Sequence, residues 1–262
     1  LTLGIDYFVN DAFSCSHRRH SSTVGVTNFL PSFMGTHLEK EIKALEGVLN
    51  NPNKPVAAII GGSKVSTKID VINFLLKKMD IIIIGGAMAN TFVAAKGLDV
   101  GKSLFEKECI DLAKELIEKS QNNNCNLILP TDFIVSKNLK KNAEYTTANF
   151  DSLPHNMMAL DIGPKSIELI NKNINNCKTI LWNGPLGAFE TYPFDKGTNK
   201  VASHVSSLTK QKKILSVAGG GDTVSALNNA KVLNDFSYVS TAGGAFLEWL
   251  EGKVLPGIEP IS

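Results

Sequence analysis

The stretch that decides the fold is MDIIIIGGAM, residues 79–88, in which an apolar β-branched run ends in two glycines. The same arrangement recurs as PVAAIIGGSK (55–64), ILSVAGGGDT (214–223) and SYVSTAGGAF (237–246). Glycine lets the backbone approach a ligand closely, and a helix that starts after it presents unpaired N–H groups to an anion. Several such junctions on one edge of a parallel sheet predict a polyphosphate ligand, and a nucleotide is the first choice.

The composition narrows the class of protein. The chain has 262 residues, of which 43% are hydrophobic and 20% charged, as in ordinary globular proteins. A formal net charge of +2 does not indicate a nucleic-acid or membrane surface. The four cysteines lack C-x-x-C spacing, which argues against a zinc site or a disulfide framework. We expect a cytoplasmic monomer with no nucleic-acid or membrane partner.

The sequence offers no candidate for a membrane helix or a signal peptide. Its most apolar run, residues 81–89, is far shorter than the roughly 20 residues needed to cross a bilayer. The first residues, LTLGIDYFVND, lack a basic region and carry Asp6. They also lack an initiating Met and begin almost directly in a strand pattern. We interpret this as a chain whose natural N-terminus is missing.

From residue 55 onward, strand and helix patterns alternate. Strands are expected at 55–61, 79–85, 125–130, 178–182, 213–218 and 236–240, and helices at 64–78, 87–97, 103–120, 164–175, 196–209, 222–230 and 244–251. This order predicts a Rossmann-like, three-layer α/β domain with a six-stranded, mainly parallel sheet covered on both faces. The polar residues 133–156 are expected to form a loop or a small hairpin. Ligands of such sheets bind beyond the carboxyl ends of the strands.

A helix is expected at 36–50, where Leu38, Ile42, Leu45 and Leu49 recur at helical spacing. Thr36 and Glu39 form a T-x-x-E pattern that is typical of a capping box, and Ser103 with Glu106 forms another. We expect the first helix to connect two units. The division that we predict is a remnant of a second α/β domain at 1–35, an interdomain helix at 36–50 and a nucleotide-binding domain at 51–262.

Two lysines, Lys64 and Lys68, follow the first glycine turn in GGSKVSTK. On a helix they would share a face, and two ammonium groups beside a helix N-terminus repel each other unless an anion lies between them. The segment is not a P-loop, since G-x-x-x-x-G-K-[ST] is absent. An anion site is favoured over a solvated lysine pair.

The segment AGGGDT places Asp222 and Thr223 at the expected start of a helix. Asp222 alone is as well explained as a helix N-cap, but the three glycines before it favour close approach of a ligand. Beside bound phosphates, an aspartate is a natural ligand for Mg²⁺. Gly243 and Gly244 offer a further cluster of N–H groups, suited to a phosphoryl group in transfer.

Two more segments carry polar residues that could have either a functional or a structural role. WNGPLGAFE contributes Asn183, Pro185 and Glu190, each of which alone is as well explained by a tight turn or a surface charge. HRRHSS contributes His17 and Arg18. Adjacent guanidinium groups disfavour a metal there and favour an anionic partner, although a basic patch on the edge of a severed domain is equally consistent.

The chain resembles the phosphoglycerate kinase family along nearly its whole length. The resemblance rests on YFVNDAFSCSHRRHSS, PVAAIIGGSKVSTKI, GGAMANTFVAAKG, DVGKSL, ALDIGPKS, ILWNGPLGAFE, SVAGGGDT and STAGGAFLEWLEGKVLPG, in this order. It implies two facing α/β domains joined by a helix, one binding 3-phosphoglycerate and the other MgADP or MgATP. Closure of the two would allow reversible phosphoryl transfer from 1,3-bisphosphoglycerate to ADP, a step of glycolysis.

The resemblance also implies roles for single residues. Lys68 would follow the transferring phosphoryl group with help from Lys64, and Asp222 would hold Mg²⁺. Gly220, Gly221, Thr223 and Asn183 would contact the nucleotide phosphates, Glu190 the ribose hydroxyls, and Gly62, Gly86 and Pro185 the adenine. Gly243 and Gly244 would stabilise the transferring charge, and Arg18 and His17 would bind the acid substrate.

The chain departs from the family pattern in two ways. Ala87 and Ala242 stand where the family usually carries a glycine, which is expected to tighten the adenine slot or stiffen a loop without abolishing binding. The early N-terminal motifs of the family, with most of its substrate-binding basic residues, have no counterpart here. We therefore expect adenine nucleotide binding with little turnover.

Two other classes of function compete with this interpretation. An NAD-dependent oxidoreductase would suit a Rossmann-like sheet, but the G-x-G-x-x-G fingerprint after a strand is missing. A non-catalytic adenine-nucleotide-binding module, naturally short, is the second. Titration with ADP, with and without Mg²⁺, and with NADH separates the nucleotide-binding alternatives from the oxidoreductase.

Overall fold

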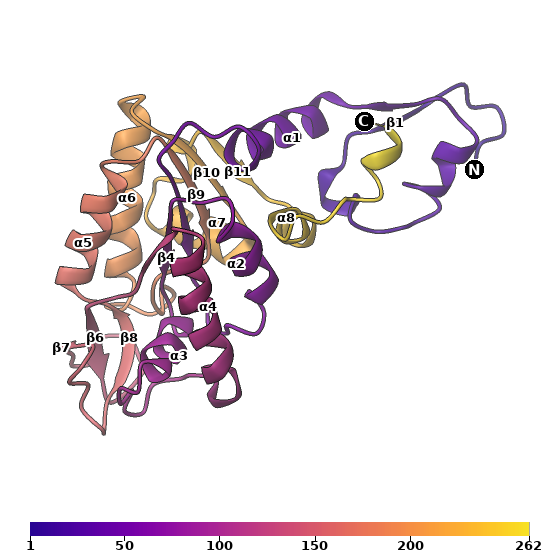
Figure 1. Ribbon diagram of the computed structural model, residues 1–262. Helices are drawn as coiled ribbons and strands as arrows, with labels where there is room; N and C mark the ends of the chain where they lie inside the picture. The colour runs from indigo at the N-terminus through magenta and orange to yellow at the C-terminus, as the bar shows by residue number, and fades with distance from the viewer. Residues whose placement is uncertain (262) are drawn as a thin grey trace.

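A computed structural model describes residues 1–261 of the chain, and its centre is a parallel sheet (Figure 1). The six strands follow the order β11-β10-β9-β3-β4-β5, and every neighbouring pair is parallel. Their bounds are Val56–Ile60 (β3), Ile81–Ile84 (β4), Asn126–Ile128 (β5), Thr179–Asn183 (β9), Leu215–Gly219 (β10) and Tyr238–Ser240 (β11). All six expected strands are thus confirmed, and the expected three-layer α/β architecture with them.

Helices cover both faces of the sheet, with α5 and α6 on one side in Figure 1 and α2 and α4 on the other. One core is built with α1 (Thr36–Leu49), α2 (Ile69–Leu75), α3 (Met88–Ala95), α4 (Ile110–Asn122) and α8 (Gly243–Leu250). The other core is built with α5 (Pro164–Ile174), α6 (Lys196–Lys210) and α7 (Gly221–Asn229). No helix within residues 1–261 combines the length and the apolar character needed to span a membrane.

Strand β3 shows why the sequence specifies a sheet buried on both faces. All five of its residues are buried. Val56, Ala58 and Ile60 belong to the core on one face, and Ala57 and Ile59 to the core on the other. Side chains alternate between the faces of a strand, so a continuous apolar run is stable only where helices cover both.

The polar excursion forms a second, smaller sheet. Strands β6 (Asp132–Ser136), β7 (Thr146–Asn149) and β8 (Met158–Ile162) pair antiparallel in the order β7-β6-β8. It lies at the end of the molecule opposite α1 in Figure 1. The expected loop or hairpin at 133–156 is therefore a hairpin that a third strand extends.

The N-terminal segment is joined to the large sheet by α1 and contacts the C-terminal segment (Figure 1). Within it, β1 (Phe8–Asn10) pairs in parallel with β2 (Ser32–Met34), beside the short 3₁₀ helices η1 (Phe13–Cys15) and η2 (Gly25–Asn28). The chain returns to this segment near its end, where Asn10 Nδ2 donates to the carbonyl of Gly257 at 2.9 Å. Ser262, the last residue of the expected domain 51–262, lies outside the described residues.

Two helices begin later than the sequence pattern predicts. The helix expected at 64–78 begins at Ile69, and the one expected at 103–120 becomes α-helical at Ile110, after the 3₁₀ turn η3 (Lys107–Cys109). The predicted capping box of Ser103 and Glu106 is therefore wrong. Ser103 Oγ instead accepts a hydrogen bond from the Ala159 amide at 2.8 Å, which fastens the segment before α4 to β8.

The capping box predicted for α1 is also wrong, because a residue from β1's end takes its place. Asp11 Oδ1 accepts hydrogen bonds from the amides of His37 (2.7 Å) and Leu38 (2.9 Å). The N-cap of α1 is Gly35, and a Cβ there would overlap the Asp11 carboxylate. Thr36 lies inside the helix, where no side-chain cap bond is formed. The expected apolar face of the helix is confirmed as buried.

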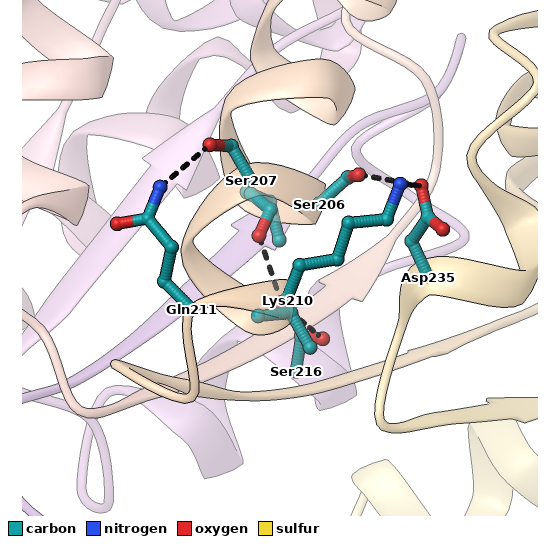
Figure 2. Close-up of polar contacts among 8 residues, drawn as sticks. Ser206, Ser207, Lys210, Gln211, Ser216 and Asp235 are labelled. Carbon is teal, nitrogen blue, oxygen red and sulfur yellow. Dashed lines mark hydrogen bonds and ion pairs between the residues drawn. The ribbon is translucent and has the colours of Figure 1, made fainter.

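A polar network at the C-terminal end of α6 links this helix to the segment before β11, as Figure 2 shows. Asp235, in the 3₁₀ turn η4 (Leu233–Asp235), accepts from Ser206 Oγ at 2.6 Å and pairs with Lys210 Nζ at 2.9 Å. These contacts hold the pKa of Asp235 below its ordinary value, the Ser206 hydrogen bond most of all. Because α6 runs antiparallel to the strands, this network lies at their amino-terminal edge, away from the glycine junctions.

Replacing Asp11 by Ala is expected to destabilise the protein by about 1 kcal/mol, as loss of a helix N-cap does. Urea unfolding followed by circular dichroism measures the change. Thr36→Ala is the matched control and is expected to leave the free energy of unfolding nearly unchanged, since Thr36 forms no cap bond. Equal losses in the two variants would contradict the assignment of the cap to Asp11.

Candidate functional site

A cavity of about 320 Å³ lies at the carboxyl ends of the strands. Five residues that the sequence predicted as ligand contacts line it, from three of the junctions and the turn after β9: Gly62, Gly86, Pro185, Glu190 and Asp222. A site at this edge is what the geometry of open α/β sheets predicts.

The junctions around the cavity are packed backbone against backbone. A Cβ on Gly61 would overlap the carbonyl of Pro185, and one on Gly86 would lie 2.5 Å from the carbonyl oxygen of Gly62. Gly86 also has a φ of 69°, a conformation that favours glycine. Only residues without a side chain allow the turns after β3, β4 and β9 to meet this closely, so these glycines shape the cavity.

A polar cluster centred on Lys68 joins the start of α2 to the ends of β9 and β10. The Lys68 ammonium donates to Asn183 Oδ1 at the end of β9, and Asn183 Nδ2 donates to the Gly219 carbonyl of β10 at 2.7 Å. The Gly184 amide donates to Thr223 Oγ1 at 2.7 Å. Gly220, with a φ of 96°, is the N-cap of α7 and lies against the Asn183 amide. Five residues predicted from separate motifs therefore lie together: Lys68, Asn183, Gly220, Asp222 and Thr223.

Burial sets the charge behaviour of Lys68. Desolvation lowers the pKa of its ammonium to about 8, against the opposing effect of the nearby Asp222 carboxylate. The group is therefore mostly charged at neutral pH and loses its charge as the pH rises past 8. A cation held in partly apolar surroundings interacts strongly with an anion that reaches it.

The prediction that Lys64 and Lys68 share a helix face is wrong. Helix α2 begins at Ile69, Lys68 is its N-cap, and Lys64 lies exposed in the loop before it. Val65, between the two lysines, is fully buried and fixes this loop to the core.

Glu106 is a residue that sequence reasoning placed wrongly and that bears on the site. Its carboxylate accepts from the Ser66 amide at 3.0 Å and from Ser66 Oγ at 2.5 Å. Burial alone would raise the pKa of this carboxyl, but the Ser66 hydrogen bonds, the Val65 backbone and the charge of Lys64 together hold it below the ordinary value. Glu106 thus anchors the loop that carries Lys64 and leads to Lys68.

Asp161 is a second buried acid that the sequence did not single out. It lines the cavity from β8, and its two carboxylate oxygens accept from the amides of Gly197 (2.6 Å) and Ile162 (2.9 Å). Burial raises the pKa of Asp161 to about 8. Because both oxygens bind backbone amides, Asp161 fixes the cavity wall to the first turn of α6.

The remaining predicted residues lie outside the cavity. Gly243 and Gly244 form the first turn of α8 as expected. A Cβ on Gly244 would lie 2.8 Å from Nε2 of His17, so the N-terminal segment contacts this turn directly. Arg18 is exposed and is not brought to the cavity.

Ala87 and Ala242, where the resemblance led us to expect glycine, have unstrained backbone conformations. Ala87 has a φ of −64° at the N-cap of α3 and lines the cavity. Ala242 has a φ of −87° at the N-cap of α8. Neither position needs the left-handed conformation that favours glycine, so the Cβ of Ala87 narrows the cavity without distorting its loop.

Asp222, the residue predicted to hold a cation, lines the cavity close to Lys68. Within residues 1–261 there is no group of three or more His, Cys, Asp or Glu side chains that could form a protein-only metal site. One carboxylate at a cavity rim, beside Lys68, fits Mg²⁺, which takes one or two protein carboxylates and completes its shell with ligand and water oxygens.

Fold and cavity define a class: an α/β protein whose ligand site opens between the glycine-rich carboxyl ends of parallel strands. The chain belongs to the phosphoglycerate kinase family, because the family model of that name matches residues 1–253. This membership leaves the NAD-dependent oxidoreductase alternative without support.

Relatives and solved structures agree with this membership. The phosphoglycerate kinase of Rhizobium meliloti (strain 1021) is 52% identical over 254 residues, which are 97% of this chain and 64% of that protein. That of Brucella melitensis biotype 1 is 54% identical over the same shares. The structure of phosphoglycerate kinase from Coxiella burnetii superposes with a TM-score of 0.94 at 44% identity, over 97% of this chain and 65% of that one. The chain therefore spans about two thirds of the length of its relatives.

The Lys68 ammonium is expected to titrate near pH 8, well below an ordinary lysine. Asp222→Asn is expected to lower this pKa further, because it removes the carboxylate that favours the charged form. NMR of the protein with ¹³C-methylated lysines measures both values, and Lys68→Arg identifies the signal. A Lys68 signal that titrates near pH 10.5 would contradict the burial of its amine.

Glu106→Ala is expected to free the loop at 63–68, because the Ser66 amide and hydroxyl lose their acceptor. Hydrogen exchange of the Ser66 amide should accelerate by about tenfold or more, as for loss of a hydrogen bond to a charged group. Glu108→Ala, an exposed glutamate in the same segment, is the control. Unchanged exchange in Glu106→Ala would show that the loop is held by Val65 alone.

Proposed function

We propose that this chain is the adenine-nucleotide-binding part of a phosphoglycerate kinase, a glycolytic phosphotransferase. The reaction is reversible phosphoryl transfer between 1,3-bisphosphoglycerate with ADP and 3-phosphoglycerate with ATP. The observation that carries the proposal is the position of the glycine junctions and Asp222 around a single cavity, with Lys68 close to Asp222 and hydrogen-bonded to Asn183. Family membership over residues 1–253 supports the same assignment.

The nucleotide would extend along the cavity from the junction after β4 to the start of α7. Its base would lie in the slot lined by Gly62, Gly86 and Pro185, with the ribose hydroxyls on Glu190. Its phosphates would meet Lys68, Asn183, Gly220, Gly221 and Thr223. The first turn of α7 offers backbone N–H groups there, which favour a negative charge.

Asp222 would hold the Mg²⁺ that accompanies the nucleotide. When bound, the metal would supply positive charge that neutralises the phosphates. The protein's own contribution would be the Asp222 carboxylate in the cavity lining, with Lys68 close to it. Magnesium and ATP or ADP are therefore part of this proposal.

The residues suit phosphoryl transfer because the reaction asks for positioning and charge neutralisation more than for covalent chemistry. Lys68 would follow the transferring group, with Lys64 in the preceding loop, and the amides of Gly243 and Gly244 would stabilise its negative charge. No general base is needed, because the accepting oxygen is already ionised. Arg18 and His17 would bind the acid substrate.

We propose that the chain divides into a remnant of the substrate-binding domain at 1–35, an interdomain helix at 36–50 and the nucleotide-binding domain from 51 onward. The N-terminal segment exposes apolar side chains on its small sheet, with Tyr7 62% and Phe33 55% exposed. A segment that leaves such side chains in water supports the expectation that this chain alone turns over little substrate. The four free cysteines support a reducing, cytoplasmic setting for the monomer that we expect.

One observation favours the second candidate, a non-catalytic adenine-nucleotide-binding module. The cavity is lined entirely by residues from Gly62 to Asp222, so it needs nothing from the N-terminal segment. The two candidates predict the same binding and differ in turnover. A coupled kinase assay of the chain, alone and joined to the remaining length of a relative, separates them.

Calorimetric titration with ADP, with and without Mg²⁺, tests the proposed site. ADP is expected to bind, and Mg²⁺ to strengthen its binding. Asp222→Asn is expected to remove this gain, with a loss of about tenfold or more in the presence of Mg²⁺, since even indirect metal contacts are worth this much. Asp111→Asn, an exposed aspartate on α4, is the control. Binding of NADH and not of ADP would overturn the proposal.

A further inference from the structure

Asn90 lies in the first turn of α3 and lines the cavity. Only 1% of it is exposed. The neighbouring wall is apolar and includes Leu104, Phe133 and Leu160. A buried amide among such side chains needs hydrogen-bond partners for both of its polar atoms.

One hydrogen bond identifies which atom of the Asn90 side-chain amide is the nitrogen. Asn90 Nδ2 donates to the carbonyl oxygen of Leu104 at 3.0 Å. A carbonyl only accepts hydrogen bonds, so the atom facing Leu104 is the nitrogen and the other is the oxygen. Within residues 1–261, Asn90 Oδ1 is buried and has no hydrogen-bond partner. An acceptor left in this state carries a free-energy cost that a ligand donor would relieve.

The other acids of the cavity are committed elsewhere. Both carboxylate oxygens of Asp161 accept backbone amides. Asp222 belongs to the Lys68 cluster, and Glu190 is exposed. Among the side chains that line the cavity, Asn90 Oδ1 is thus the buried acceptor for which residues 1–261 provide no donor.

We propose that Asn90 is a specificity-determining residue whose Oδ1 accepts a hydrogen bond from the exocyclic amine of a 6-aminopurine base. This inference rests on the proposed function, since it assigns the base end of the nucleotide to the wall of the same cavity. The side chains of Leu104 and Leu139 also line the cavity and are 61% and 52% exposed. The oxygen is shielded from water, so solvent does not replace the amine.

The chemistry predicts which bases the site distinguishes. A purine with hydrogen in place of the amine leaves Oδ1 without a donor. The free-energy cost of this unpaired acceptor then remains in the complex. A purine with a carbonyl oxygen in that position sets two acceptors against each other. A site built to bind a donor therefore rejects both, whereas an apolar slot alone would accept the unsubstituted purine almost equally.

The test compares ADP with purine riboside 5′-diphosphate, which differs only by loss of the amine, in calorimetric titrations of the 262-residue chain with Mg²⁺. The wild-type protein is expected to bind ADP about threefold to tenfold more tightly, the range of one neutral hydrogen bond. Asn90→Leu is expected to bring the two affinities within about twofold of each other. Using the ratio of affinities cancels any general loosening of the cavity in the variant.

Asn171→Leu is the matched control, because Asn171 Oδ1 on α5 is also buried without a partner in the described chain, yet Asn171 does not line the cavity. It is expected to keep the wild-type ratio. An affinity ratio in Asn90→Leu equal to that of the wild-type protein overturns the inference. A ratio below twofold in the wild-type protein overturns it as well, without any variant. Should Asn90→Leu not fold, Asn90→Ala takes its place. Absence of any ADP binding contradicts the proposed function itself. ADP binding with equal affinities for the two nucleotides contradicts only the role of Asn90.

Discussion

Close contact between backbones at one edge of the sheet is the constraint on which the site depends. The turns after β3, β4 and β9 meet where a Cβ on Gly61 or Gly86 would collide with another main chain. Each turn ends a strand buried on both faces, so the sheet cannot move to make room. The cavity is therefore a product of three rigid strands and of the missing side chains at their ends.

This arrangement explains how a cation can be kept partly buried at the edge of an apolar core. Lys68 is held by Asn183, which in turn is held by β10, and desolvation lowers the pKa of the amine towards neutrality. The nearby Asp222 carboxylate acts in the opposite direction and favours the charged form. An anionic ligand would supply the missing partner, which is why the electrostatics of the cavity favour phosphate.

Helix ends show where local sequence rules reach their limit. The patterns at Thr36 and Ser103 satisfy the capping-box rule, yet neither forms one. Asp11 caps α1 from 26 residues away in sequence, and Glu106 binds Ser66 across 40 residues. A local rule describes the hydrogen-bond partners available within one turn of helix. A folded chain also brings distant acceptors to the same amides, and these replace the local acceptors where their geometry is better.

From the sequence alone come the six strands, the order of strands and helices, and the edge of the sheet at which the cavity lies, because apolar periodicity and glycine position are local properties of the chain. The sequence also identified a minority of the residues that line the cavity, among them Gly62, Pro185 and Asp222. Only the tertiary structure decided that Glu106 anchors the lysine loop and that Asp161 and Asn90 form part of the cavity wall. These roles depend on partners that are far away in sequence, and no spacing along the chain encodes a contact that exists only after the sheet has brought its strand ends together.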